Sequence, residues 1–206
     1  MKNLAARLPP FRLRFSAGFA VLISVVYFYD NDGILAAMFP AVIIHELGHI
    51  AALFALGSPP RALNAGLAGF SLDYSEELSG GGEMISALAG PFAGLFFAWL
   101  CAVLGARIES RYLLLCAGLG FAINAFNLIP ALPLDGGRVL FAALTLRVSP
   151  QTAARIMLIL GICLGLILTV FGVFFLVNGQ GIALIPAGLW LLLSQHKSFR
   201  NSAFLP

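Results

Sequence analysis

The residues with the clearest chemical potential are the two histidines and the glutamate of HELGH, residues 45–49. In a helix, His45 and His49 stand one above the other because they are four residues apart, so both can reach one metal ion. Neutral imidazoles suit zinc, and a catalytic zinc keeps one position open for water. Glu46 lies beside the first histidine and can accept a proton from that water without binding the metal. The pattern therefore predicts a zinc site that generates hydroxide for attack on a carbonyl group.

The surroundings of HELGH strengthen this prediction. The motif lies within residues 34–56, an apolar stretch long enough to cross a membrane. A match this short can occur by chance, and histidines can serve packing alone. However, ionisable groups within a membrane span are costly and usually mark a function. Two histidines and a glutamate together therefore favour a metal site over a packing role.

A third protein ligand has to come from another part of the chain. The remaining histidine, His196, lies in a polar tail and is expected to be solvated there. Asp135 lies in apolar surroundings, where an unpaired carboxylate would be costly. The alternatives are three acids of the polar loop that follows the motif: Asp73, Glu76 and Glu77. We favour Asp135 because the loop acids lie outside the span, and we keep those acids as alternatives.

The composition indicates what kind of protein positions these residues. Hydrophobic residues make up 60% of the 206 residues and charged residues only 10%, against about 25% charged residues in ordinary soluble domains. We therefore expect an all-α polytopic membrane protein that forms one domain, residues 1–206, within the lipid bilayer. The predicted spans are residues 13–29, 34–56, 84–106, 112–129, 153–177 and 182–195.

The basic residues set the expected orientation of these spans. The net charge is +3, but the basic residues flank apolar spans and form no patch with exposed aromatics, so nucleic acid is not an expected partner. With a cytoplasmic N-terminus, ten of the 12 Lys and Arg residues fall inside, and only Arg107 and Arg111 fall outside. This pattern predicts a multi-pass protein of the cell membrane with both termini in the cytoplasm. The second and fourth spans then run in the same direction, so HELGH and Asp135 can meet at a similar depth.

One connection has a strand-like pattern. Within residues 57–83, Phe70, Leu72 and Tyr74 alternate with polar residues. This period of two is typical of a short strand, which can pair with residues 62–68 as a hairpin. A cytoplasmic loop explains the same region equally well.

A second connection, residues 127–148, breaks the fourth span before Asp135. Pro130 and Pro133 cannot continue a helix, and the two glycines after Asp135 permit a tight turn. The apolar run over residues 139–148 holds too few residues to cross. We expect it to enter the inner leaflet as a re-entrant or interfacial segment, which is tolerated where broken backbone lines a protein cavity.

Two asparagines precede Asp135. Asn127 lies eight residues before it, and Asn124 lies one helical turn earlier on a similar face. An amide donor near the metal could stabilise an oxyanion or hold the substrate backbone. On spacing alone, a hydrogen bond between helices is the favoured role for Asn127.

Three motifs together resemble those of the site-2 protease family of intramembrane zinc metalloproteases, peptidase family M50. They are HELGH at 45–49, NLIPALPLDGG at 127–137 and the small-residue motif ALAGPFAGL at 87–95. These anchors cover most of residues 34–148, which the resemblance identifies as a three-helix catalytic core.

The resemblance implies a role for each residue of the site. His45, His49 and Asp135 would bind one zinc ion per chain, and Glu46 would be the general base. For Asn127, the resemblance implies a contact with the substrate or the oxyanion instead of a hydrogen bond between helices.

The resemblance also implies how the substrate is held. Residues 57–83 would form a membrane-associated strand element that binds an unwound substrate by β-augmentation, with Phe70 and Leu72 as substrate contacts. Unwinding is required because a helical substrate hides its carbonyl groups in its own hydrogen bonds. Pro133 would shape the loop before Asp135.

The chain also departs from the family pattern. It has no PDZ domain between spans and no CBS domain after the last span, so it resembles a minimal form, similar to the branch that contains the sporulation protease acting on a pro-sigma factor. Substrate choice would then come from membrane contacts or from regulatory membrane proteins. In addition, Gly94 stands where many relatives have an asparagine, which leaves the surroundings of the ligands open.

These expectations combine into one hypothesis of function. The chain would be a zinc endopeptidase that cleaves a transmembrane or membrane-proximal protein substrate near the cytoplasmic face. A metal-ion or solute transporter is the alternative, because intramembrane histidines and acids can line a pathway. That alternative has no use for Glu46, and the sequence has no inverted repeat. A non-proteolytic binding protein is a third class, against which the intact HELGH argues.

Overall fold

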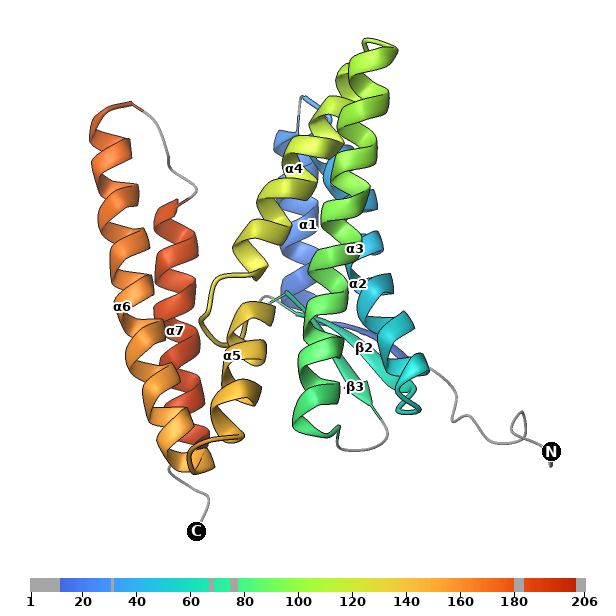
Figure 1. Ribbon diagram of the computed structural model, residues 1–206. Coiled ribbons are helices and arrows are strands. Elements are labelled where there is room, and N and C mark those ends of the chain that lie inside the picture. Colours follow the sequence, from blue (N-terminus) through green and yellow to red (C-terminus); the bar gives the residue numbers. More distant parts are fainter. Residues whose placement is uncertain (1–11, 31, 67–68, 75–77, 180–183, 203–206) are drawn as a thin grey trace, which may run out of the picture. The chain divides into compact units, whose positions relative to one another are not determined.

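The computed structural model describes residues 12–30, 32–66, 69–74, 78–179 and 184–202 (Figure 1). Within these ranges the chain forms seven helices and three short strands. The chain divides into two compact units, residues 1–124 and 125–206, and the boundary falls near the end of helix α4.

The first unit holds the helix that carries HELGH. Its helices are α1 (Ala17–Tyr29), α2 (Ile34–Ala55), α3 (Gly80–Arg107) and most of α4 (Arg111–Asn127). The carboxylate of Asp30 begins α2, because its two oxygens accept hydrogen bonds from the backbone N–H groups of Ile34 and Leu35, both at 2.7 Å. Ser79 begins α3 in the same way by accepting from Gly82 N–H at 3.2 Å.

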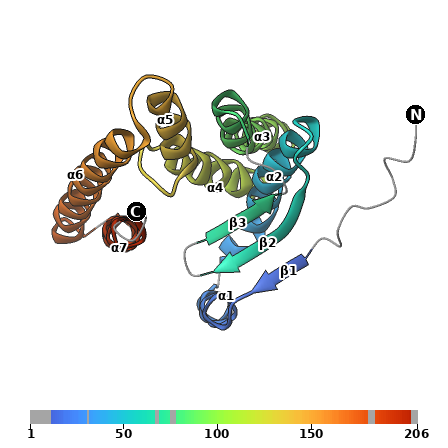
Figure 2. The same cartoon turned by 90° about the horizontal axis from the view of Figure 1, so that it is seen from below.

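Helices α2 and α3 pack side by side through small residues (Figures 1 and 2). A Cβ atom at Gly48 would lie 2.8 Å from the Cβ atom of Ala93 and would collide with the backbone of Ala89. Only glycine at position 48 therefore allows this close approach. Because Gly48 lies between the two histidine positions of α2, the approach sets that part of α2 directly against α3.

The three strands form one sheet in the first unit (Figure 2). The strands are β1 (Arg12–Phe15), β2 (Pro60–Gly66) and β3 (Gly69–Tyr74). β2 and β3 are antiparallel, with Ala65 opposite Phe70 and Leu63 opposite Leu72. This confirms the predicted hairpin, although β2 ends at Gly66 and residues 67–68 lie outside the described residues.

One boundary predicted from the sequence is wrong. Residues 13–15 do not belong to the first helix but to β1, which pairs with β2 in parallel, Leu13 opposite Leu63. The physical reason is an alternation of charged and apolar residues in β1, followed by Ser16, whose side chain accepts a hydrogen bond from Phe19 N–H at 3.1 Å and so begins α1.

The second unit contains the break before Asp135 that the prolines predicted. Helix α4 ends at Asn127, and a turn leads to α5 (Asp135–Thr145), α6 (Pro150–Val177) and α7 (Leu184–Ser202). With 11 residues, α5 spans about 16 Å, which is too short to cross a membrane. Helices α6 and α7 pack closely, since a Cβ atom at Gly188 would lie 2.7 Å from the backbone nitrogen of Thr169.

Three helices, α2, α3 and α6, are long and apolar enough to cross a membrane. Large apolar side chains stay exposed on them, as Phe92, Phe96 and Trp99 do on α3. The prediction of a mainly helical membrane protein with a small sheet is confirmed at this level. The number of six spans and the re-entrant placement of α5 stay predictions.

Candidate metal centre

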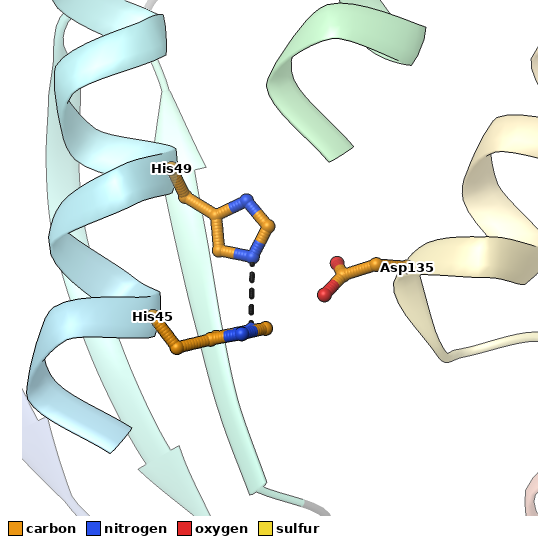
Figure 3. A group of neighbouring side chains, drawn as sticks. All are labelled: His45, His49 and Asp135. Atoms are coloured by element: carbon orange, nitrogen blue, oxygen red, sulfur yellow. Dashed lines mark hydrogen bonds between the residues drawn. The ribbon is translucent and has the colours of Figure 1, made fainter. Parts of the chain in front are cut away.

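The two histidines of HELGH lie on the buried face of α2, as their spacing predicted. His45 and His49 are each 4% exposed. Their rings are nearly perpendicular, with centroids 4.8 Å apart, and the two Nε2 atoms lie 3.1 Å from each other (Figure 3). Both rings therefore direct their Nε2 atoms toward the same point.

The tautomer of His49 follows from its partner on α3. Its Nδ1 atom lies 2.8 Å from the backbone carbonyl oxygen of Ser86. A carbonyl oxygen only accepts hydrogen bonds, so Nδ1 carries the proton and donates. In the neutral ring, Nε2 of His49 then carries a lone pair, which is the form that binds a metal.

The tautomer of His45 follows from Asn124 on α4. The Nδ2 amide group of Asn124 donates to the carbonyl oxygen of Gly120 at 2.6 Å, which places its Oδ1 atom toward His45. Oδ1 of Asn124 lies 2.8 Å from Nδ1 of His45 and accepts its proton. Nε2 of His45 therefore also carries a lone pair.

This donor set fits a zinc ion. Two lone pairs that face each other at 3.1 Å repel unless a cation is shared between them. In a tetrahedral site with Zn–N distances of about 2.0–2.1 Å, two nitrogen ligands lie about 3.3 Å apart. The observed separation is close to that value, and each ring has the hydrogen-bond partner on its other nitrogen that metal-binding histidines have.

A glycine on α3 makes room for the second histidine. A Cβ atom at Gly90 would lie 2.5 Å from Cε1 and 2.6 Å from Cδ2 of His49. The glycine of the GPFAG motif therefore lets the ring lie against the backbone of α3. The small-residue motif noted in the sequence is part of the wall of the histidine site.

Glu46 follows His45 in α2 and is half-buried. A carboxylate in that position adjoins the buried face of the helix without replacing either imidazole. Its predicted role as the general base stays a prediction.

Asp135 is the first residue of α5 and is buried. Figure 3 shows its carboxylate, which projects from the start of that helix. One carboxylate oxygen lies 3.5 Å from Nη1 of Arg138, one turn further along α5. Arg138 is therefore an ion-pair partner of Asp135 within the same helix.

The backbone before Asp135 is held by close packing in the second unit. A Cβ atom at Gly137 would lie 2.5 Å from the backbone nitrogen of Leu132, so the glycines after Asp135 fit only as glycines. The buried side chain of Gln195, from α7, donates a hydrogen bond to the carbonyl oxygen of Leu132. Gly161 on α6 leaves room for that amide, because a Cβ atom there would lie 2.5 Å from Cδ of Gln195.

The alternative ligands gain no support from the part of the chain that the structure describes. Asp73 lies on β3 with its side chain 55% exposed, 3.7 Å from Nη1 of Arg14, as a surface ion pair. Glu76 and Glu77 lie outside the described residues, and so does the side chain of His196.

The predicted substrate contacts lie at two places. Asn127 is the last residue of α4 and is half-buried. Phe70 and Leu72 are half-buried on β3, and the ring of Phe70 packs edge-to-face on Phe19 with centroids 5.4 Å apart. Their contact with a substrate stays a prediction.

Sequence reasoning missed the contact between Asn124 and His45. It noted Asn124 only as a neighbour of Asn127 on a similar helix face. The available signal was a polar amide, Asn124, within an apolar span of a chain that also carries the small-residue motif ALAGPFAGL.

Comparisons with known proteins identify relatives that are named as zinc metalloproteases. The sequence pattern that defines Peptidase family M50 matches residues 105–170. The zinc metalloprotease MJ0392 of Methanocaldococcus jannaschii is 28% identical over 141 residues, which are 66% of this chain and 41% of that protein. The putative zinc metalloprotease sll0528 of Synechocystis is 31% identical over 116 residues, 52% of this chain and 31% of that protein. The chain thus spans less than half the length of these two relatives.

The fold has a counterpart among solved structures. The site-2 protease from Methanocaldococcus jannaschii has a TM-score of 0.71 at 22% identity, covering 93% of this chain and 92% of that chain. The fold is thus similar to that of a site-2 protease, and residues 105–170 of the chain match Peptidase family M50.

Proposed function

We propose that the chain is an intramembrane zinc endopeptidase that hydrolyses a peptide bond of a transmembrane or membrane-proximal protein near the cytoplasmic face. The observation that carries this proposal is the histidine pair, buried in an apolar helix with both Nε2 lone pairs turned to one point. The names of the two relatives, zinc metalloproteases, support the same reaction class.

One zinc ion per chain would be held by His45, His49 and Asp135. In support, the Nε2 atoms of His45 and His49 lie 3.1 Å apart, and Asp135 is a buried carboxylate at the first position of α5. Two imidazoles and one carboxylate form a known ligand set for catalytic zinc, which leaves a fourth position open. Bound zinc would supply a Lewis acid that activates water and polarises the scissile carbonyl.

The other residues of the site act on the proton and on the substrate. Glu46 accepts the proton from the attacking water, since it adjoins a ligand on the same helix. The amide of Asn127 at the end of α4 binds the substrate backbone or the oxyanion that forms during attack.

The substrate would bind as an added strand. In the described part of the chain, β3 has β2 on one side only, so its other edge can pair with an extended peptide. Phe70 and Leu72 would contact that peptide. This placement supplies the unwound conformation that hydrolysis requires.

The whole chain would form one membrane domain. Besides α2, α3 and α6, the helices α1, α4 and α7 cross the bilayer, α5 enters it as a re-entrant segment, and both termini lie in the cytoplasm. The asymmetry of the Lys and Arg residues supports this orientation. Regulatory membrane proteins would select the substrate.

Metal removal and restoration test the proposal. The full chain, purified in detergent and reconstituted in liposomes, is stripped with a chelator and compared before and after zinc is returned, using a single-span protein as the substrate. Cleavage that is lost and then restored by zinc supports the protease. Zinc-dependent ion flux without cleavage would instead identify a transporter.

A further inference from the structure

Asn124 is the most deeply buried polar residue that contacts the histidine pair. Its side chain is 0% exposed, within a helix of mainly apolar residues. Both ends of its amide are in use: Nδ2 donates to the carbonyl oxygen of Gly120, and Oδ1 accepts from Nδ1 of His45. A buried amide with both ends paired has one orientation only, because reversing it would leave two unsatisfied groups.

The space for this amide comes from α3. A Cβ atom at Gly94 would lie 2.5 Å from Cγ of Asn124 and would collide with both terminal atoms of the amide. The clash involves a short side chain buried between helices, so Asn124 could not move aside without leaving His45. Asn124 and Gly94 therefore fit only as a pair.

We infer that Asn124, with Gly94 as its recess, is a positioning residue that holds His45 in the tautomer and orientation needed to bind zinc. Nδ1 of His45 must carry its proton for Nε2 to act as a ligand, and Oδ1 of Asn124 is the acceptor for that proton. Without it, the ring can rotate about its side-chain bonds or take the other tautomer. Hydrogen-bond partners of this kind typically change metal affinity by about 10- to 100-fold.

This inference rests on the proposed zinc site but is distinct from it. Ser86 accepts the hydrogen bond of His49 through its backbone carbonyl oxygen, which a side-chain substitution does not remove. Asn124 accepts the hydrogen bond of His45 through its side chain, so its role can be tested by substitution. The three residues His45, Asn124 and Gly94 all lie in the first unit.

The test is zinc affinity, measured by chelator competition on the full chain in detergent. Asn124→Leu keeps the size of the side chain and removes the acceptor, so we expect zinc affinity to fall about 10- to 100-fold. Asn124→Asp keeps an acceptor for Nδ1 of His45 and should retain affinity within a few-fold. The visible absorption bands of the cobalt-substituted protein should change in Asn124→Leu and persist in Asn124→Asp.

A double-mutant cycle separates positioning from general packing. Gly94→Ala should weaken zinc binding when Asn124 is present and should have no further effect in an Asn124→Ala background. Gly118→Ala is the matched control on α4, because a Cβ atom there meets no atom within 4 Å. The melting temperature of the metal-free protein is measured for every variant.

The outcomes are distinct. Equal zinc affinity of wild type, Asn124→Leu and Gly94→Ala would overturn the inference while leaving the zinc site intact. Additive losses in the cycle would also overturn it, because the pair would then act independently. Absence of zinc binding in wild type would instead remove the proposed function itself.

Discussion

The imidazole of His49 occupies the space that a side chain at Gly90 would need. A Cβ atom at position 90 would lie 2.5 Å from Cε1 of the ring, while Nδ1 of the same ring is tied to the backbone of α3 at Ser86. The ring is thus held from two sides by one helix. The glycine at position 90 of α3 therefore determines where the imidazole of His49 on α2 can lie.

The first prediction concerns this wall. Gly90→Ala should displace the ring of His49 from its hydrogen bond with the backbone carbonyl oxygen of Ser86. Zinc affinity should then fall by about tenfold or more. Gly81→Ala is the control on the same helix, since a Cβ atom there meets nothing within 4 Å. Chelator competition measures both variants. Zinc binding by Gly90→Ala at the wild-type level would show that His49 is not held in this way.

The second prediction concerns the loop before Asp135. Gln195→Leu removes the donor to the part-buried carbonyl oxygen of Leu132, and the loss of such a hydrogen bond costs about 0.5–1.5 kcal/mol. The unfolding midpoint in a denaturant titration should fall accordingly. Ser194→Ala is the control, because Ser194 bonds only the carbonyl of its own helix at Trp190 among the contacts seen. An unchanged midpoint for Gln195→Leu would mean that this tie does not stabilise the second unit.

The third prediction identifies the third ligand. Asp135→Asn removes the charge that a zinc ligand supplies, so the purified protein should retain much less zinc, with affinity reduced by at least about 100-fold. Asp73→Asn, which alters only an exposed ion pair with Arg14, should leave zinc content unchanged. Elemental analysis after dialysis distinguishes the two. If the variants behaved in the opposite way, the ligand would have to be sought among the acids of residues 73–77.

The fourth prediction concerns the strand edge. Leu72→Ala should lower kcat/KM for a single-span substrate by about tenfold, mainly through a higher KM, because the side chain is predicted to contact the substrate. Zinc content should stay at the wild-type level, since β3 carries none of the proposed ligands. A fall in kcat at unchanged KM would argue against a role in binding.

Much of the site could be predicted from the sequence because its signals are local. The spacing of His45 and His49 fixes their common face, and Pro130 and Pro133 end the fourth helix regardless of the rest of the fold. The alternation around Phe70 likewise depends only on neighbouring residues, and the structure confirms the hairpin.

Other features could not be predicted because they depend on contacts between distant segments. Strand β1 forms because it pairs with β2, with Leu13 opposite Leu63, fifty residues later in the chain. Its alternating pattern is short and adjoins an apolar run, so the sequence alone assigns these residues to the following helix. The hydrogen bond that Nδ1 of His45 donates to Oδ1 of Asn124 depends on how α4 is rotated against α2. Single-sequence patterns do not fix that rotation, so Asn124 was seen only as the neighbour of Asn127.

The most direct test of the account is cleavage by the Glu46→Gln variant. Because Glu46 adjoins the ligands without being one, the variant should bind one zinc ion per chain as the wild type does. With the proton acceptor removed, its cleavage of a single-span substrate in liposomes should fall by about 100- to 10,000-fold, in line with the loss of a catalytic acid–base residue. Full zinc content with cleavage lost is the predicted result. Full zinc content with cleavage unchanged would contradict the mechanism at its centre.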